Sequence, residues 1–393
     1  MNFLLPAEWQ QLRLKVRKFL DTEVIPLETK ESAAGLPPEL FAHMRAKAKS
    51  AGLWTPHLPP ELGGLGLSLL AMCLVFEEAG RSPLGPLALN CAAPDEGNMH
   101  LLHRAATPEQ QRKYLHPLAA GAIRSCFAMT EPAPGAGSDP TMLQTRAEKH
   151  GEQWVINGRK WFTTGANGAA FAIVAAVTNP GVPARQGTTL FLVEAGTPGF
   201  HLVRDVPTMT TDWPGGHGEI LFENCAVPES HVLGGVGQGF KLMQVRLGPA
   251  RLTHCMRWLG AAQRSQEIAL QYARERQAFG KHLVEHQAVE WMLADSAMDL
   301  HASRLMTLEA AWKLENGSQA RQEVSMCKVF VAEAVGRVID RAIQICGAKG
   351  VSSDLILERF YRDARAFRIY DGPSEVHRMV IARGLVQGGR HEA

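Results

Sequence analysis

The chain has 393 residues, of which 46% are hydrophobic and 20% charged, and its 41 basic and 39 acidic residues give a net charge of +2. This composition is typical of a soluble globular protein and argues against disorder and against a coiled coil. The near balance of charge gives no electrostatic reason to expect nucleic acid or an anionic membrane surface as a partner. The length predicts two or three domains, or one large composite.

The first zone, residues 1–122, is predicted to be helical. Apolar side chains recur at helical spacing over Ala7–Glu28, as expected for an amphipathic helix. Caps and breaks mark three further predicted helices: Pro38–Ala51, Ser68–Gly80 and Thr107–Ala119, the last with Thr107 as its cap.

The second zone, residues 123–233, has the pattern of a small antiparallel β domain. Short β-type runs are predicted at Ser125–Thr130, Trp154–Asn157, Phe171–Val177, Thr188–Val193 and Glu219–Phe222. The turn signals Asn157-Gly158, Asn179-Pro180 and Thr197-Pro198-Gly199 separate these runs, so the strands should be short and joined by tight turns.

The third zone, residues 234–393, is predicted to be helical again. A glycine-rich segment, Gly235–Gly239, opens it, and we interpret this segment as a connector because no βαβ unit surrounds it. Four long helices follow at Met243–Arg276, Glu285–Leu314, Gln319–Cys346 and Asp354–Phe367. Their short connections predict an antiparallel bundle. The fold class is therefore mainly α with a central antiparallel β domain.

The seven cysteines form no CxxC pair, and most lie in apolar stretches. We expect buried reduced thiols and a cytoplasmic protein. Met1–Gln10 lacks the features of a secretory signal, and no apolar run reaches the about 18–20 residues of a membrane span, so no membrane insertion is expected. His282 and His286 match an inverted zinc motif, but the preceding Phe279-Gly280 breaks the helix that such a site needs. We expect a structural or ligand-contact role there and no metal.

Five separated segments carry the chemistry: Met129-Thr-Glu-Pro132 with Gly137-Ser-Asp139, Asn157–Thr164, Arg274–Lys281 with Glu285-His-Gln287, Gln344–Gly347, and Tyr370–Arg378. In this order they resemble the acyl-CoA dehydrogenase family along nearly the whole chain, closest to the branch of family members ten and eleven. The resemblance implies an N-terminal helical domain, a middle β domain and a C-terminal four-helix bundle. It also implies FAD as cofactor, a role in fatty acid β-oxidation and a homo-oligomer, with a dimer of dimers favoured.

The implied reaction is α,β-dehydrogenation of an acyl-CoA thioester, with a carboxylate taking the α-proton and hydride passing to the flavin N5. The base aligns with Asp371, where most relatives have Glu; Asp is one methylene shorter, about 1.5 Å of reach. The alternative base position holds Ala250. Arg251 either orients Asp371 or the substrate, or is an ordinary exposed arginine. Gly372 and Ser138 complete the implied substrate contacts, although the loop before Ser138 is longer than in relatives.

The implied cofactor contacts are Met129, Thr130, Ser138, Phe162, Thr164, Arg276, Phe279, His286, Gln287, Gln344, Gly347, Ser374 and Glu375. In the family the adenine half of FAD binds across a dimer interface, so Gln344 and Gly347 would serve the neighbouring subunit. Adjacent side chains of a strand face opposite sides. Only one of Trp161 and Phe162 should therefore stack on the flavin, and we favour Phe162.

The implied partners are an acyl-CoA and an electron-transfer flavoprotein. The branch suggests longer, 2-methyl-branched or 4-hydroxy-derived acyl chains. Two alternatives remain: a flavin oxidase of the same fold, similar to nitroalkane oxidase, which also uses an Asp base, and a non-catalytic acyl-CoA-binding relative. Fold alone does not decide between them.

Overall fold

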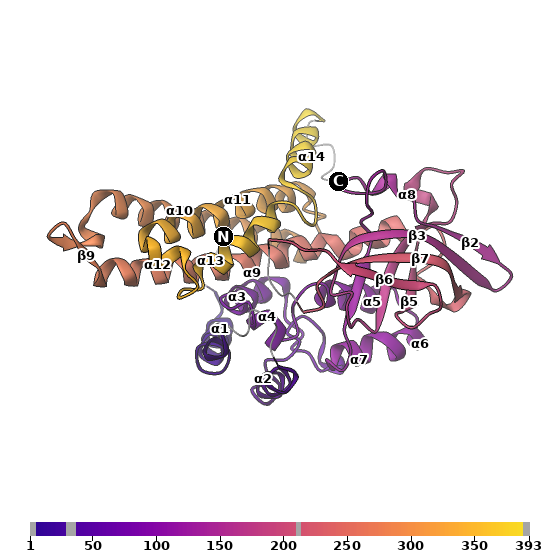
Figure 1. The fold of residues 1–393 in the computed structure, drawn as a ribbon, viewed down its shortest axis with the longest axis horizontal. Helices are drawn as coiled ribbons and strands as arrows, with labels where there is room; N and C mark the ends of the chain where they lie inside the picture. Colours follow the sequence, from indigo (N-terminus) through magenta and orange to yellow (C-terminus); the bar gives the residue numbers. More distant parts are fainter. Residues whose placement is uncertain (1–4, 29–36, 210–213, 388–393) are drawn as a thin grey trace.

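The computed structural model describes residues 5–28, 37–209 and 214–387. Within these ranges a bundle of long helices lies beside a β domain, and shorter N-terminal helices cover one side of the bundle (Figure 1). The predicted fold class, mainly α with a central β domain, is confirmed.

The N-terminal helices follow the predicted pattern with local differences. They are α1 (Ala7–Phe19), α2 (Pro38–Ser50), α3 (Leu69–Ala79), α4 (Gly85–Ala88), α5 (Asp95–Ala105), α6 (Pro108–Gln110) and α7 (His116–Ala119). The Ser68 hydroxyl accepts the Ala71 N–H at 3.2 Å and begins α3, while Thr107 and Gln110 form a capping box that begins α6. The sequence did not predict α5.

The β domain is an eight-stranded sheet with mixed pairing. Its strands are β1 (Ser125–Ala128), β2 (Arg146–His150), β3 (Gln153–Thr164), β4 (Phe171–Val177), β5 (Thr188–Glu194), β6 (Phe200–Asp205), β7 (His217–Pro228) and β8 (Val232–Leu233). The order is β6-β7-β3-β2-β4-β5-β8, and β1 pairs with β4. Most pairs are antiparallel as predicted, but β1 and β2 each meet β4 in parallel.

Strand β3 corrects two predictions. Asn157-Gly158 was predicted to be a turn, but both residues lie inside the strand, where a register shift against β7 accommodates them. A second shift lies between Lys160 and Thr163, and Phe162 there has a left-handed φ of 52°. Side chains do not alternate strictly at such a bulge. The alternation rule therefore cannot assign Trp161 and Phe162 to opposite faces of the sheet.

The main helices of the C-terminal zone are three long ones and two shorter ones. They are α9 (Gly239–Glu275), α10 (Gln287–Glu315), α11 (Arg321–Cys346), α13 (Leu357–Arg365) and α14 (Ser374–Val386). A small hairpin, β9 (Gln277–Ala278) and β10 (Lys281–His282), joins α9 to α10, and α12 (Ala348–Val351) follows α11. The fourth predicted long helix is shorter than expected, because a turn at Ser352–Asp354, capped by the Ser352 hydroxyl, delays it to Leu357.

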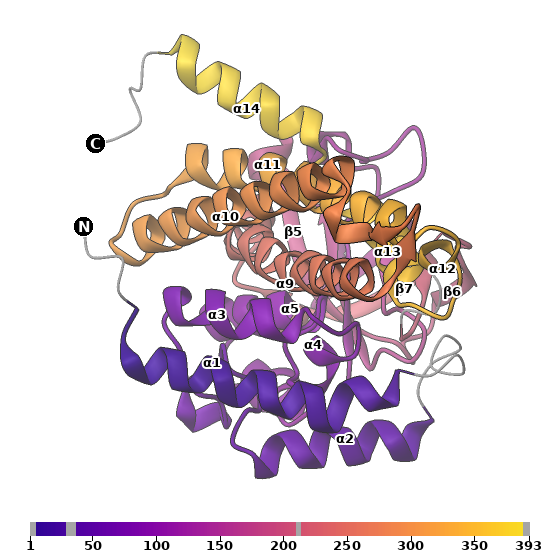
Figure 2. The ribbon, with the colours of Figure 1, turned by 90° about the vertical axis from the view of Figure 1, so that its left-hand side faces the viewer.

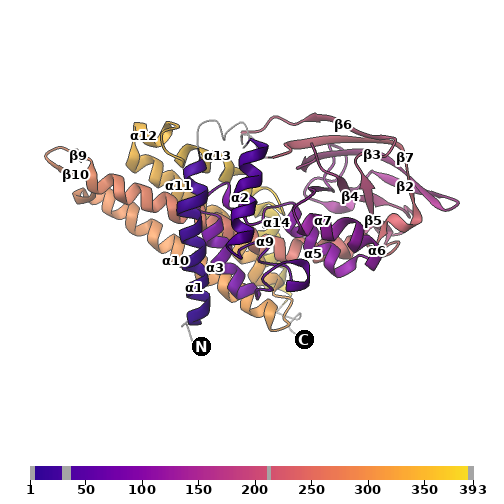
Figure 3. The same ribbon diagram turned by 90° about the horizontal axis from the view of Figure 1, so that it is seen from below.

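Helix α9 occupies the centre of the molecule. It packs against α3, α5, α10 and α11, and the end-on view shows it between the N-terminal helices and the upper bundle helices (Figure 2). One hydrophobic core joins α1 and α3 to α9 and α11, with Phe76, Leu252 and Val331 among its members. From below, α1 and α2 run side by side across the bundle (Figure 3). The N-terminal helices and the bundle therefore share one core.

All seven cysteines are described, buried and free of disulfides, which confirms the predicted buried thiols. None of the helices in the described ranges combines the length and the apolar character needed to cross a membrane.

Candidate active site

Asp371 lies at the junction between α9 and the segment that leads into α14, and its main chain is held on two sides. Its carbonyl oxygen accepts a hydrogen bond from Arg251 Nε at 2.9 Å and lies 3.2 Å from His377 Nε2. The residue has a left-handed φ of 53°, which a non-glycine residue adopts only when its surroundings hold it there. Arg251 is thus a half-buried contact of the loop, not an exposed arginine.

The carboxylate of Asp371 is surrounded by cationic groups. Oδ2 lies 3.2 Å from His254 Nε2 on α9. Burial works to raise the pKa of Asp371, but the hydrogen bond from His254 and the guanidiniums of Arg246 and Arg251 outweigh it and hold this pKa well below its usual value. The carboxyl group is therefore ionised at neutral pH, as a proton-accepting base must be.

Arg246 links this carboxylate to the β domain. Its Nε donates to Asn98 Oδ1 on α5 at 2.8 Å, and its guanidinium lies over the Phe127 ring of β1, 4.2 Å from the ring centroid. Because Phe127 immediately precedes Ala128-Met129-Thr130, Arg246 connects the surroundings of Asp371 to the predicted flavin contacts Met129 and Thr130.

The predicted flavin contacts meet at the end of β1 and the bulge of β3. The Trp161 N–H donates to the Thr130 carbonyl at 2.8 Å. The Trp161 and Phe162 rings stack on each other, 5.0 Å apart and inclined by 16°, and Phe162 is 46% exposed. Trp161 Nε1 and Thr163 Oγ1 are buried without a hydrogen-bond partner among the described residues. The Thr164 hydroxyl lies 3.0 Å from His217 Nδ1.

These features fit a planar polar ring system. The exposed ring of Phe162 offers a surface for stacking, and buried N–H or O–H groups without partners are costly unless a ligand satisfies them. The stretch from Trp161 to Thr163 supplies both, so the residues present fit the ring system of a flavin.

Below this bulge, a buried ion pair anchors the loop that carries Ser138. Lys160 Nζ donates to the Met129 carbonyl at 3.0 Å and to Glu131 Oε1 at 2.8 Å. Glu131 also accepts the N–H groups of Gln144 and Thr145 at 2.7 and 2.9 Å. Ser138 itself is exposed.

A second group of predicted cofactor residues lies at the far end of the bundle. Arg276, Phe279, His286 and Gln287 surround the β9–β10 hairpin, and Gln344 and Gly347 lie at the end of α11. Phe279 is 97% exposed and its ring lies 6.3 Å from that of His286. His282 and His286 flank one 3-10 turn, and among the described residues no cluster of three His, Cys, Asp or Glu side chains could hold a metal ion.

The remaining predicted residues follow Asp371. Gly372 has a φ of 98°, and a Cβ at this position would lie 2.7 Å from His377 Nε2, so only glycine fits. Ser374 is buried and donates to Glu333 Oε1 at 2.9 Å. Glu375 is exposed on the first turn of α14.

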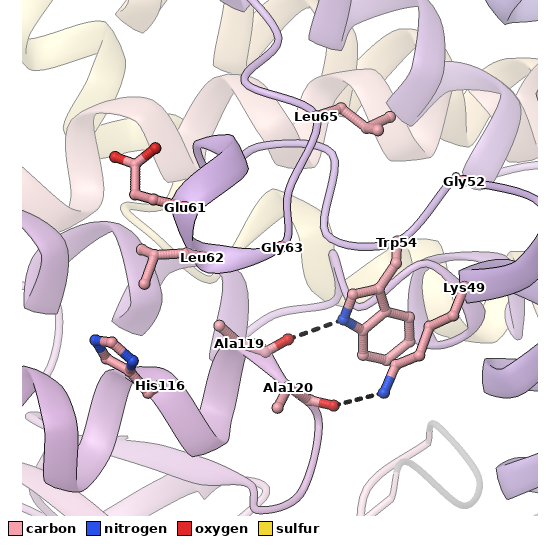
Figure 4. Close-up of a pocket in the computed structure, with 10 residues that line it drawn as sticks. All are labelled: Lys49, Gly52, Trp54, Glu61, Leu62, Gly63, Leu65, His116, Ala119 and Ala120. Carbon is pink, nitrogen blue, oxygen red and sulfur yellow. Dashed lines mark hydrogen bonds between the residues drawn. The ribbon is translucent and has the colours of Figure 1, made fainter.

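Two cavities lie away from Asp371. One of about 410 Å³ is lined by Lys49, Trp54, Glu61, His116 and their neighbours in the N-terminal helices (Figure 4). Its Lys49 and Trp54 donate to the carbonyls of Ala120 and Ala119, each at 2.8 Å (Figure 4). The other, of about 400 Å³, is lined by residues that include Arg264, Tyr272 and Lys349. The wall of the first cavity already satisfies these two donors, so the base and the aromatic bulge identify the candidate site better than cavity size does.

Comparisons with known proteins agree with this site. Residues 6–122, 126–225 and 237–386 match the families described as the N-terminal, middle and C-terminal domains of acyl-CoA dehydrogenase. The chain belongs to the acyl-CoA dehydrogenase family. This is a family of flavin-dependent oxidoreductases, which confirms the resemblance and the predicted class of enzyme.

Two relatives of this acyl-CoA dehydrogenase cover nearly the whole chain. One is described as "Probable acyl-CoA dehydrogenase FadE2" of Mycobacterium tuberculosis, 40% identical, with 98% of this chain and 96% of the relative covered. The other is acyl-CoA dehydrogenase family member 11 of Gallus gallus, 40% identical over 95% of this chain. The chain spans 50% of the length of that second relative.

Two solved structures have the same fold. A Mycobacterium abscessus protein, whose description is also that of an acyl-CoA dehydrogenase, is 40% identical with a TM-score of 0.93, and 98% of this chain and 99% of that chain are covered. An FAD complex of PigA is 28% identical with a TM-score of 0.88, with 98% and 99% covered.

Sequence reasoning missed the polar residues behind Asp371 in this acyl-CoA dehydrogenase. His254 and Arg257 follow Arg251 at intervals of three residues and so lie on one face of α9, while Glu96 and Asn98 come from α5. The three-residue spacing of these side chains could have indicated that they share one face of α9. Without α5, however, these side chains had no visible partner.

Proposed function

We propose that this protein catalyses the FAD-dependent α,β-dehydrogenation of an acyl-CoA thioester to the trans-2-enoyl-CoA, with Asp371 as the base that takes the α-proton. The observation that carries this proposal is the ionised, partly buried Asp371 carboxylate, joined through Arg246 and Phe127 to the aromatic bulge of β3.

Each of the chain's own residues has a defined task in this proposal. Asp371 accepts the α-proton, and Arg251 and His377 hold its main chain so that the carboxylate faces the substrate. The Gly372 N–H is the donor for the thioester carbonyl, where negative charge develops. Bound FAD would supply the acceptor for the β-hydrogen, which leaves as hydride. Stacking on Phe162, whose ring is itself stacked on that of Trp161, would hold the flavin ring.

The separation of the two predicted cofactor regions supports a dimeric FAD site. Glu275, at the end of α9, lies 21 residues beyond His254, so about 30 Å of helix at about 1.5 Å per residue separates the hairpin from Asp371. This distance exceeds the length of one extended FAD. The hairpin of each subunit would therefore complete the site of its neighbour, with Arg276 at the pyrophosphate and Phe279 against the adenosine.

A stripe of exposed apolar side chains on α10 supports this oligomer. Trp291, Met298, Leu305 and Trp312 are 61%, 62%, 40% and 49% exposed, and they recur every seven residues. This spacing is that of a helix seam that packs against another helix. A second copy of the chain would cover the stripe, and a tetramer would form as a dimer of such dimers.

The remaining assignments concern partner and compartment. We propose an electron-transfer flavoprotein as the acceptor of the electrons and the cytoplasm as the compartment. Seven buried free thiols support a reducing environment.

Anaerobic mixing of the purified flavoprotein with a panel of straight, branched and hydroxylated acyl-CoAs tests the proposal. At least one acyl-CoA should bleach the flavin absorbance, and Asp371→Asn should slow this reduction by about 10²–10⁴-fold, as for loss of a general base, while FAD content stays at the wild-type level. Peroxide formation from nitroethane without coenzyme A would instead indicate the oxidase. Acyl-CoA binding without bleaching would indicate a non-catalytic relative.

A further inference from the structure

In the Asp371 side chain, Oδ2 is held by a neighbour, whereas Oδ1 makes no hydrogen bond or ion pair within the described residues. Oδ2 faces His254 Nε2 at 3.2 Å, and the main chain is held by Arg251 and His377. The His254 ring also lies beside the Tyr370 ring, with centroids 4.7 Å apart. The contact with His254 thus restricts the two side-chain torsions that the held main chain leaves free.

Arg257 determines which nitrogen of His254 carries the proton. Arg257 Nη2 lies 3.3 Å from His254 Nδ1, and because a guanidinium only donates, Nδ1 must accept. The proton of the neutral ring is then on Nε2, which donates to Asp371 Oδ2. Burial and the charge of Arg257 lower the pKa of His254 and favour this neutral ring, although Asp371 acts in the opposite direction.

Arg257 is itself held from the opposite side. Its Nη1 donates to the Cys91 carbonyl at 2.8 Å and lies 3.6 Å from Glu96 Oε2. Glu96 also accepts the Thr253 hydroxyl at 3.0 Å. A continuous buried chain therefore runs from α5 through Arg257 and His254 to Asp371.

We propose that His254 is a positioning residue for Asp371: its Nε2–H holds Oδ2, so that Oδ1 alone is presented to the α-proton of the substrate. The inference rests on the proposed dehydrogenase function. An Asp base is one methylene shorter than Glu, so its carboxylate must be aimed closely, and a misplacement of about 1 Å can cost about 100-fold in rate.

Other charged groups also face this carboxylate. The cations Arg246 and Arg251 approach it from α9 and Lys328 from α11, and the imidazole of His377, whose pKa burial lowers to about 4, lies on the α14 side. Loss of His254 removes one hydrogen bond and leaves these cations in place. The carboxylate should then become easier to protonate, because burial opposes its charge.

Three variants separate positioning from packing. His254→Phe keeps a ring beside Tyr370 and removes the donor, while His254→Gln keeps a side-chain N–H. Trp258→Phe is the matched control, because Trp258 Nε1 donates a hydrogen bond to the Tyr370 hydroxyl beside Asp371 and not to Asp371 itself.

In H254F the limiting rate of flavin reduction should fall about 100-fold with little change in KM. In the pH profile of this rate, the acid limb, where the rate falls as Asp371 is protonated, should move to higher pH by about one unit or more. The rate of H254Q should be at least about tenfold higher than that of H254F. W258F should keep the wild-type acid limb. A wild-type rate and acid limb in H254F would overturn the proposal, as would equal losses in H254F and H254Q without a shift of the limb.

Thermal unfolding gives a readout that needs no turnover. If His254 holds the carboxylate, H254F should lower the melting temperature clearly in the wild-type background and by less than half as much in Asp371→Asn. Equal losses in both backgrounds would show that His254 only packs, and would overturn the proposal. If no acyl-CoA reduces the wild-type flavin, the proposed function fails, and this comparison still decides whether His254 holds Asp371.

Discussion

Replacing Glu131 by glutamine tests how strongly the buried ion pair beneath β3 supports the aromatic bulge. The side chains of Lys160 and Glu131 are 0% and 2% exposed. In the variant Lys160 would keep the Met129 carbonyl and an amide oxygen, but no counter-charge. The main chain at Met129 and the loop after Glu131 would lose their common anchor.

The magnitude follows from the surroundings of the two groups. Burial lowers the pKa of Lys160 to about 8, even though Glu131 raises it; the difference from 10.5 is worth about 3.5 kcal/mol at about 1.4 kcal/mol per pH unit. Burial would raise the pKa of Glu131, but Lys160 and the loop N–H groups lower it. The surroundings stabilise the charge of Glu131 more than that of Lys160, because the carboxylate accepts four hydrogen bonds whereas the ammonium donates two. Removing one charge from such a pair should cost about 3–5 kcal/mol of unfolding free energy.

Urea unfolding of wild type and E131Q between pH 6 and 9 measures this cost and its pH dependence. Without Glu131 the folded-state pKa of Lys160 should fall below about 8, while unfolded Lys160 stays protonated to about 10.5. In this window the unfolded variant binds more protons, so its stability rises with pH by up to about 1.4 kcal/mol per pH unit. In the wild type the unfolding free energy rises with pH in this way only above about pH 8. The deficit of E131Q should therefore shrink towards pH 8 and then stay constant.

A double variant provides the control. In E131Q/K160M both charges are gone, so most of the lost stability should return. A deficit below about 1 kcal/mol in E131Q, within the range of an exposed pair, would refute the reasoning. So would a deficit that is independent of pH, or a double variant less stable than E131Q.

Three further predictions concern the cofactor site and the subunit contact. Phe279→Ser should weaken FAD binding to apoprotein about fivefold, through loss of aromatic packing worth about 1 kcal/mol, as measured by flavin fluorescence; unchanged affinity would exclude Phe279 from the site. Trp291→Glu with Trp312→Glu should dissociate the oligomer in sedimentation experiments and release FAD, whereas Glu290→Gln on the same helix should do neither; an intact oligomer would contradict the seam. Gly372→Ala should cost about 1–3 kcal/mol in backbone strain and slow flavin reduction, and normal rates and stability would show that the loop tolerates a Cβ.

Local sequence determined much of this protein. Helical periodicity located the α1 and α9–α11 segments, and the cap at Thr107 was identified because a threonine directly precedes Pro108 and Glu109; in the structure Thr107 forms a capping box with Gln110. The motifs around Thr130, Arg276 and Asp371 were recognisable for the same reason. Each motif lies within a few consecutive residues, so its pattern survives without knowledge of the fold.

Only the tertiary structure decided what surrounds these motifs. The left-handed φ of Phe162 depends on pairing with β7, so alternation along β3 could not reveal that Trp161 and Phe162 stack on each other. His254 contacts Asp371 across more than a hundred residues, and its proton is placed by Arg257, which α5 holds in turn. Local patterns cannot encode such contacts, because the partners are brought together only when α9 packs between α5 and the segment after α13.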